Sequence, residues 1–298
     1  MTAPPALTLI VATRNRQESV RRLLSQLQFP AQRNWELLIV DNGGADDTPD
    51  LLQQLAPPAG VRVVREPRRG KGNALNAGIE AARGELLVFS DDDIEPGPDW
   101  LEELLAASQR HPDADVFGGR IMIRSQSIPG WIQRSRNLQE ILLTEHDLGG
   151  VEQQYPPNRF PLGPNMAVRR RALAGIELPW DPRLGPGSTL PVGDERCFFC
   201  RIGQGAGKKR IYVPAAVVYH RIEGRELRLS TVLRRCYQGG YSGGLLQARF
   251  PAQMEPGGRR RGLLRMLAQT RSVRELVCAS VRAAGFARGV SRRSGEAG

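Results

Sequence analysis

Long apolar runs and cysteine are both scarce in this sequence. No stretch approaches the roughly 18 to 20 consecutive apolar residues of a membrane-spanning helix, and no basic region precedes the first apolar run, residues 7–12. We therefore expect neither a membrane-spanning segment nor a signal peptide. Four cysteines among 298 residues are too few for a disulfide scaffold, which indicates a reducing, cytoplasmic location.

Aromatic residues make up only 6% of the chain, whereas hydrophobic residues make up 40% and charged residues 24%. This composition is typical of a globular protein, and it excludes disorder of the whole chain because enough apolar surface is available for a core. The length suits one large domain or two small ones. The sequence contains no internal repeat.

The net charge of +11 is confined to the C-terminal quarter of the chain. Residues 225–298 contain 15 Arg and 4 Glu, so residues 1–224 are neutral overall. We therefore divide the chain into a main domain, residues 1–224, and a basic, mainly helical extension, residues 225–298. The chemistry of the main domain must be explained without the basic extension.

Apolar runs of strand length alternate with segments of helical periodicity in the first hundred residues. This alternation predicts a mostly parallel sheet with helices on both faces, as in a Rossmann-like α/β fold. The predicted strands are 7–12, 37–40, 61–64 and 86–89, and the predicted helices are 19–27, 51–55, 74–82 and 100–107. Further on, 172–174 and 196–202 are predicted as helices and 211–213 and 216–220 as strands, while 118–158 is mixed and 180–191 is a loop.

Polar residues follow the predicted strands directly. Thr13 and Asn15 follow the first strand, Asp41 follows the second, and 91–93 are three successive aspartates after the fourth. Because ligands of such sheets bind at the carboxyl ends of the strands, we expect these side chains to converge on one crevice.

Three adjacent aspartates after a buried strand suggest a metal site. Mg²⁺ and Mn²⁺ prefer oxygen ligands and often bridge carboxylates to substrate phosphates. Acidic clusters in loops are also common as solvated surface, and Asp41 alone suits a turn. Lys71 lies in a Gly-rich loop before a predicted helix, where a cation suits a phosphate or simply a basic surface turn.

Seven segments in order resemble the family-2 glycosyltransferases of the GT-A fold. They are VATRNR at 11–16, LLIVDNGGADDT at 37–48, GKGNALNAG at 70–78, LLVFSDDD at 86–93, GPNMAVRR at 163–170, GDE at 193–195 and VVYH at 217–220. The resemblance covers about residues 7–240. It implies a nucleotide-binding half at about 1–115, an acceptor-binding half at about 116–224, and the C-terminal helical extension outside the family pattern.

The resemblance also implies roles for individual residues. Thr13 and Asp41 would hold the nucleotide base, Lys71 would lie near the diphosphate, and Asp91 would contact the ribose. Mn²⁺ or Mg²⁺ would be bound by three side chains, those of Asp93, Asp91 and His220. His220 could alternatively be a packed histidine at the end of its strand. The expected donor-binding set is completed by Asn15, Arg16 and Asp92.

One carboxylate of the GDE segment would be the catalytic base. Glu195 is favoured because it occupies the second acidic position, and Asp194 is the alternative. Ala12 replaces the usual Pro and Arg14 the usual aromatic residue, which leaves the base of the donor open. A UDP-sugar is favoured, with GDP- and dTDP-sugars as alternatives.

The implied reaction is a metal-dependent, inverting hexosyl transfer from a nucleotide-sugar to an acceptor hydroxyl. Its sugar or lipid-linked acceptor would belong to polysaccharide, cell-envelope or glycolipid biosynthesis. A nucleotidyltransferase has a similar sheet, but it would normally carry a Gly-rich basic signature after the first strand, which residues 11–16 lack. A nucleic-acid-binding protein is the third hypothesis, although the Arg-rich extension offers few aromatic residues for base stacking, so no nucleic acid is expected.

Two further features allow more than one interpretation. Cys197 and Cys200 have the spacing of redox or zinc sites, but a single such pair within a predicted helix favours core thiols. Residues 263–281 combine Leu and Val with Arg. That pattern suits a peripheral helix on the anionic inner face of the membrane, and equally a helix that packs on the domain and exposes its arginines.

Overall fold

The computed structural model has a nine-stranded sheet in the order β3-β2-β1-β4-β8-β6-β9-β5, with β7 paired to β9. It describes residues 4–27, 34–44, 61–124, 128–135, 138–139, 142–156, 159–190, 192–203, 209–222, 224–249, 270 and 272–291. The strands are β1 (Leu7–Thr13), β2 (Trp35–Asp41), β3 (Val61–Arg65), β4 (Leu86–Asp91), β5 (Ile94–Pro96), β6 (Ala114–Arg124), β7 (Gln153–Gln154), β8 (Met166–Arg169) and β9 (Lys209–Arg221). The helices are α1 (Gln17–Gln26), α3 (Lys71–Ala81), α4 (Trp100–Arg110), α5 (Gly130–Gln133), α7 (Asp194–Ile202), α8 (Leu229–Arg249) and α10 (Val273–Ser291).

The first four strands form the parallel half of the sheet. β1 pairs in parallel with β2 and with β4, and β2 pairs in parallel with β3. Thr13 is in register with Asp41, and Ala12 with Asp91, so the polar strand ends meet at one edge. The predicted parallel sheet is confirmed, and the predicted convergence holds for Thr13 and the three aspartates 91–93 but not for Asn15 and Asp41, which are not among the described residues that line the cleft.

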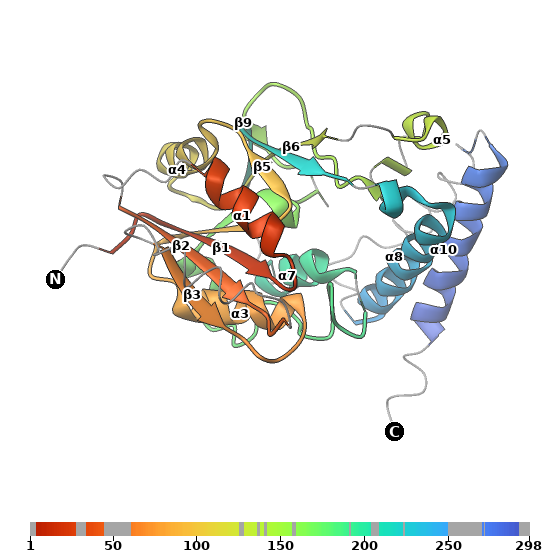
Figure 1. The fold of residues 1–298 in the computed structure, drawn as a ribbon, viewed down its shortest axis with the longest axis horizontal. Coiled ribbons are helices and arrows are strands. Elements are labelled where there is room, and N and C mark those ends of the chain that lie inside the picture. Colours follow the sequence, from red (N-terminus) through yellow and green to blue (C-terminus); the bar gives the residue numbers. More distant parts are fainter. Residues whose placement is uncertain are drawn as a thin grey trace.

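Helices cover both faces of this sheet (Figure 1), as the alternation predicted. Side chains alternate between the faces of a strand, so Leu9 and Val11 pack with α1 and α4, whereas Ile10 packs with α3 and α7. Each fully buried side chain of this size stabilises the fold by about 1.5–3 kcal/mol. The two cores fix the strand ends that carry the polar residues.

The second half of the sheet is mixed. β8 lies between β4 and β6 and is antiparallel to both, while β6 and β9 are parallel. The two strands expected at 211–213 and 216–220 are one strand, β9, with an irregularity where its pairing with β6 moves from Val213 to Val217. The helix expected at 172–174 is a short 3₁₀ turn, Arg170–Leu173. The helix expected at 51–55 lies outside the described residues.

The C-terminal helices α8 and α10 lie side by side (Figure 1) and touch backbone to backbone. A Cβ on Gly240 would lie 2.0 Å from the carbonyl oxygen of Arg282, and one on Gly244 would lie 2.3 Å from that of Phe286. Both contacts advance by four residues in each helix, so the two helices run in the same direction. Residues 273–281 of the basic extension therefore pack as part of a helix pair, and 263–269 lie outside the described residues.

Gly240→Ala is expected to lower the free energy of unfolding by about 1–3 kcal/mol, because the added methyl group must push α8 and α10 apart. Urea unfolding followed by circular dichroism measures this change. Gly224→Ala is the matched control, since its Cβ would meet nothing within 4 Å. Equal stability of the two variants would contradict the tight helix pair.

α10 also carries an exposed apolar face. Val273 is 77% exposed, and Leu276 and Val277 are exposed beside it. Within the described part of the chain, no helix has the length and apolar character needed to cross a membrane.

Candidate active site

A cleft of about 840 Å³ opens at the carboxyl ends of β1 and β4. A cleft of this size suits a nucleotide-sugar. Nine of the residues singled out from the sequence line it: Thr13, Arg16, Lys71, Asp91, Asp92, Asp93, Asp194, Glu195 and His220. Asp41 is instead buried at the end of β2, and neither it nor Asn15 is among the described lining residues.

The three successive aspartates have three different surroundings. Asp92 points inward, where it accepts hydrogen bonds from Thr13 Oγ1 at 2.7 Å and from Arg16 at 2.9 Å. Burial raises the pKa of Asp92 to about 6, against the opposing effects of Arg16 and Thr13. Asp92 therefore ties the end of β1 to the end of β4, although all three aspartates line the cleft.

Lys71 and Asp91 form an ion pair at the centre of the cleft. α3 begins at Lys71, after Gly70 in a left-handed conformation (φ 126°), so the helix starts earlier than the sequence predicted. Burial alone would lower the pKa of Lys71, but the carboxylates of Asp91, Asp194 and Glu195 raise it above its ordinary value. Lys71 is therefore a permanent cation between the aspartates after β4 and the acidic pair of α7.

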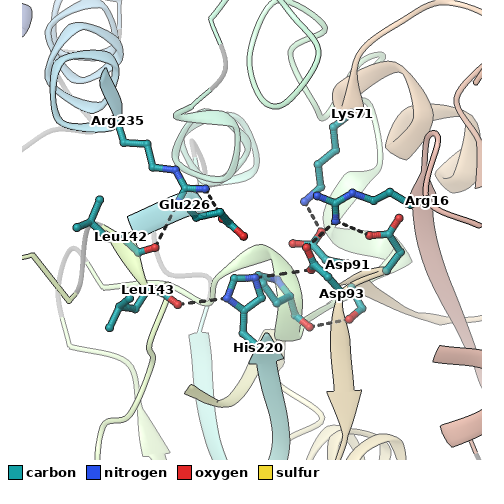
Figure 2. A network of polar contacts seen from close by, with 12 residues as sticks. Arg16, Lys71, Asp91, Asp93, Leu142, Leu143, His220, Glu226 and Arg235 are labelled. Atoms are coloured by element: carbon teal, nitrogen blue, oxygen red, sulfur yellow. Dashed lines mark hydrogen bonds and ion pairs between the residues drawn. The ribbon is translucent and has the colours of Figure 1, made fainter. Parts of the chain in front are cut away.

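His220 is oriented toward Asp93 by a backbone carbonyl. The carbonyl of Leu143 lies 3.2 Å from His220 Nδ1 and can only accept, so Nδ1 carries a proton, and Nε2 lies 3.6 Å from Asp93 Oδ1. Figure 2 shows the Leu143, His220 and Asp93 side of this arrangement together with Lys71 and Arg16.

The donor atoms of Asp93 and His220 suit a divalent metal. Asp93 Oδ1 is buried and has no hydrogen-bond partner in the described structure, while Asp93 Oδ2 accepts from Arg16 at 2.6 Å. A buried carboxylate oxygen beside an imidazole nitrogen suits a cation. No three His, Cys, Asp or Glu side chains of the described ranges are already gathered as a metal centre. Asp93 and His220 thus fit a metal, whereas Asp91 is paired with Lys71.

The acidic pair begins α7 on the other side of the cleft. Asp194 is buried, and burial together with the charge of Glu195 raises the pKa of Asp194 well above its usual range. Asp194 is therefore the protonated member, and Glu195 is the more exposed one. A Cβ on Gly163 would lie 2.8 Å from Glu195 Oε1, and one on Gly185 would lie 2.6 Å from Asp194 Oδ2, so two glycines make room for the two carboxyl groups.

Gly163→Ala is expected to reduce the rate of the catalysed reaction about ten- to a hundredfold, because the methyl group displaces the Glu195 carboxylate. The melting temperature should change little, since the displaced atom is the end of a flexible side chain. Turnover and thermal melting are compared with Gly150→Ala, whose Cβ would meet nothing within 4 Å. Wild-type turnover in Gly163→Ala would show that the position of Glu195 is unimportant.

Two asparagines support the site and were missed as functional positions. Asn42 donates to the carbonyls of Glu66 and Arg68 and accepts from Gly70 N at 2.9 Å, which fixes the loop before Lys71. Asn165 is fully buried and accepts from Trp100 Nε1 at 2.8 Å. Both lie in segments that the sequence had marked, the turn after β2 and the GPN segment.

The basic extension forms one wall of the cleft, which nothing in the sequence indicated. Arg235 of α8 donates to Glu226 at 2.6 Å and to the carbonyl of Leu142 at 3.2 Å (Figure 2). Ser242 of α8 and Arg282 of α10 also line the cleft. The extension thus carries the net positive charge of the chain and also contributes residues to the site.

The cysteine pair behaves as core thiols. Cys197 and Cys200 are free and buried in α7, and Cys197 packs with Leu184 and Leu246. Burial raises the pKa of Cys197 to about 11, so its thiol stays neutral. This is the state expected of packing residues rather than of metal ligands.

Known proteins resemble this chain in sequence and in fold. A relative from Rhizobium meliloti, succinoglycan biosynthesis protein ExoO, is 30% identical over 77% of this chain and 64% of its own length. A glucosyl-dolichyl phosphate glucuronosyltransferase of Haloferax volcanii is 23% identical over 78% of this chain and 73% of its own length. EpsH of Bacillus subtilis is 36% identical over 37% of this chain, and the match spans only 32% of that relative.

Among solved structures, the mannosyltransferase PcManGT from Pyrobaculum calidifontis, in complex with GDP-Man and Mn²⁺, superposes with a TM-score of 0.54 at 17% identity. The superposition includes the whole of this chain and 77% of the mannosyltransferase. S. aureus TarS in complex with UDP-GlcNAc has a TM-score of 0.54 at 15% identity and is covered over 82% of its length by 96% of this chain. These likenesses show the GT-A fold.

The family model "Glycosyl transferase family 2" matches residues 8–176, more than half of the chain. The match includes the polar ends of β1, β2 and β4, the loop of Lys71 and the GPN segment. Its relatives include a protein of succinoglycan biosynthesis. The chain therefore belongs to glycosyltransferase family 2.

Proposed function

We propose that this protein transfers a hexosyl group from a nucleotide-sugar to an acceptor hydroxyl with inversion at the anomeric carbon. The observation that carries the proposal is the placement of Glu195 in one cleft with Lys71, Asp91 and Asp93. A base on one side of the sugar and cations on the other suit a single in-line displacement. The complexes of fold neighbours with GDP-Man and UDP-GlcNAc support a nucleotide-sugar donor.

The donor diphosphate would lie between Lys71 and the Asp93–His220 pair. Lys71, held as a cation by three carboxylates, would attract the diphosphate and stabilise the negative charge that grows as the sugar departs. Asp93 and His220 would hold Mn²⁺ or Mg²⁺, which supplies Lewis-acid stabilisation of the leaving group. The complex of PcManGT with Mn²⁺ supports this cofactor.

Glu195 would remove the proton from the acceptor hydroxyl. Burial and the charge of Glu195 raise the pKa of Asp194 well above its usual range, which favours a proton on Asp194 and leaves Glu195 as the proposed base. The Lys71 ammonium, whose pKa the carboxylates of Asp194 and Glu195 raise, partly offsets the negative charge of this acidic pair. Arg16 would hold Asp93 in place from the other side through its 2.6 Å ion pair.

Thr13 and Asp41 remain proposed contacts of the nucleotide base, Asp91 of the ribose, and Asn15 of the donor nucleotide. Thr13 would act at the cleft floor through its bond to Asp92. Because ExoO takes part in succinoglycan biosynthesis, an exopolysaccharide or cell-envelope acceptor is proposed here. The exposed Val273, Leu276 and Val277 of α10 suit a peripheral position on the inner face of an anionic membrane.

A thermal-shift panel tests the donor. UDP, GDP, dTDP and CDP are each added with Mn²⁺, with Mg²⁺ or with EDTA, because a ligand that binds the folded state raises the melting temperature. A metal-dependent shift with one nucleotide supports the proposal and identifies the base. The absence of a shift with all four would overturn the nucleotide-sugar donor.

A further inference from the structure

Two arginines line the cleft and have no acidic partner among the described residues. Arg196 follows Glu195 in α7, and Arg282 lies in α10; both line the cleft. The Nε atom of Arg196 is buried without a hydrogen-bond partner, and its guanidinium lies over the ring of Phe160 at 5.6 Å. A Cβ on Gly239 would lie 2.7 Å from Arg282 Nη1, so this glycine leaves space for the guanidinium.

Two other arginines of the cleft have acidic partners, and Arg14 donates to the carbonyl of Asn42 at 2.9 Å. Arg16 pairs with Asp92 and Asp93, and Arg235 pairs with Glu226. Neither Arg196 nor Arg282 forms an ion pair with any described residue. Both guanidinium groups line the same cleft, and burial lowers the pKa of each, with a further lowering of the pKa of Arg196 by the charge of Arg282.

Two neighbouring, partly buried cations without a counter-charge are costly in a protein unless a ligand supplies the anion. The metal pair Asp93–His220 and Lys71 provide for the donor diphosphate, while Arg196 and Arg282 belong to α7 and the C-terminal helices. Their position next to Glu195 is the acceptor side of the proposed reaction. Among the described residues, these two guanidinium groups therefore leave N–H donors on the acceptor side that suit an anion.

We infer that Arg196 and Arg282 form a subsite for a phosphate or diphosphate group of the acceptor. This inference rests on the proposed function, because it deepens the role of the same cleft. Two guanidinium groups supply two positive charges and several N–H donors, which match a phosphate dianion better than a single carboxylate. The phosphate has two chemical sources, a lipid-linked diphosphate or a water-soluble sugar phosphate.

The test uses the full chain in EDTA, so that the donor site lacks its metal. Farnesyl diphosphate represents the lipid source and glucose 1-phosphate the soluble source, and each is titrated by isothermal calorimetry. Galacturonate, which carries one carboxylate, is the third probe. The variants are Arg196→Gln, Arg282→Gln and Arg282→Lys, with Arg288→Gln as the matched control because Arg288 is an exposed arginine of the same helix.

We expect Arg196→Gln and Arg282→Gln each to weaken binding of one phosphate probe about ten- to a hundredfold, with partial recovery in Arg282→Lys and no change in Arg288→Gln. The probe that binds more tightly identifies the source. The melting temperature without ligand, and the shift caused by nucleotide with metal, must stay at the wild-type values in all variants.

Three results would overturn the subsite. The first is that both phosphate probes bind the two Gln variants as tightly as they bind the wild type. The second is that galacturonate binds more tightly than either phosphate. The third is loss of the nucleotide-induced melting shift in the Gln variants, which would assign the arginines to the donor. Absence of any nucleotide shift in the wild type would contradict the donor proposal instead. The two failures are therefore distinguishable.

Discussion

Glu195→Gln is expected to reduce sugar transfer by about 10²–10⁴-fold while nucleotide binding stays unchanged. The substitution keeps the shape of the side chain and removes its ability to accept a proton. Glu195 is the second residue of α7, which begins at Asp194 after the left-handed Gly193, and Gly163 leaves space for its carboxylate. Turnover measured with saturating donor and acceptor, together with the nucleotide-induced melting shift, separates loss of the base from loss of binding.

Asp194→Asn is the matched control for this variant. Asp194 is buried and keeps its proton, so an amide of the same shape resembles its resting state. We expect less than about a tenfold loss of transfer in Asp194→Asn. A larger loss in Asp194→Asn than in Glu195→Gln would assign the base to Asp194, and full activity in both would remove the acidic pair from the chemistry.

The fold was predictable where apolar runs are short, continuous and followed by polar turns. The runs at 7–12, 37–40 and 86–89 became β1, β2 and β4, because strands buried on both faces need apolar residues throughout. The second half was harder to predict, since β6 contains Gly118 and Gly119 and shares its pairing with β8 and β9. Such long-range pairing leaves little local signal in the sequence.

The residues of the site were predictable where they belong to motifs at strand ends. The distribution of charge along the chain predicted them less well. The sequence grouped the three aspartates together, but only the structure distinguishes inward-facing Asp92 from Asp91 and Asp93. The contribution of α8 and α10 could not be read, because Arg235 and Arg282 reach the cleft through helix packing that depends on glycine contacts far apart in the chain. An Arg-rich extension resembles a surface feature until its packing is known.

Asp93→Ala is expected to abolish the metal-dependent part of the nucleotide melting shift and to reduce transfer by at least about a hundredfold. Within the described structure Asp93 Oδ1 is a buried oxygen without a hydrogen-bond partner, and it lies 3.6 Å from His220 Nε2, so the variant removes the group best placed to bind a cation. The metal-independent part of the shift should remain, because Lys71 is untouched.

Two further variants separate the loss of a metal ligand from a structural defect. Asp93→Asn keeps the size of the side chain but not its charge, so it should behave like Asp93→Ala if the carboxylate binds metal, and like the wild type if the residue only fills space. Asp113→Ala removes an exposed carboxylate that pairs with Lys209 at 3.1 Å and should have no effect. Calorimetric titration of Mn²⁺ in the presence of the identified nucleotide measures the affinity directly. Retention of wild-type Mn²⁺ affinity in Asp93→Ala would show that the cation, if bound, is held elsewhere, and the role of His220 beside Asp93 would then be one of packing alone.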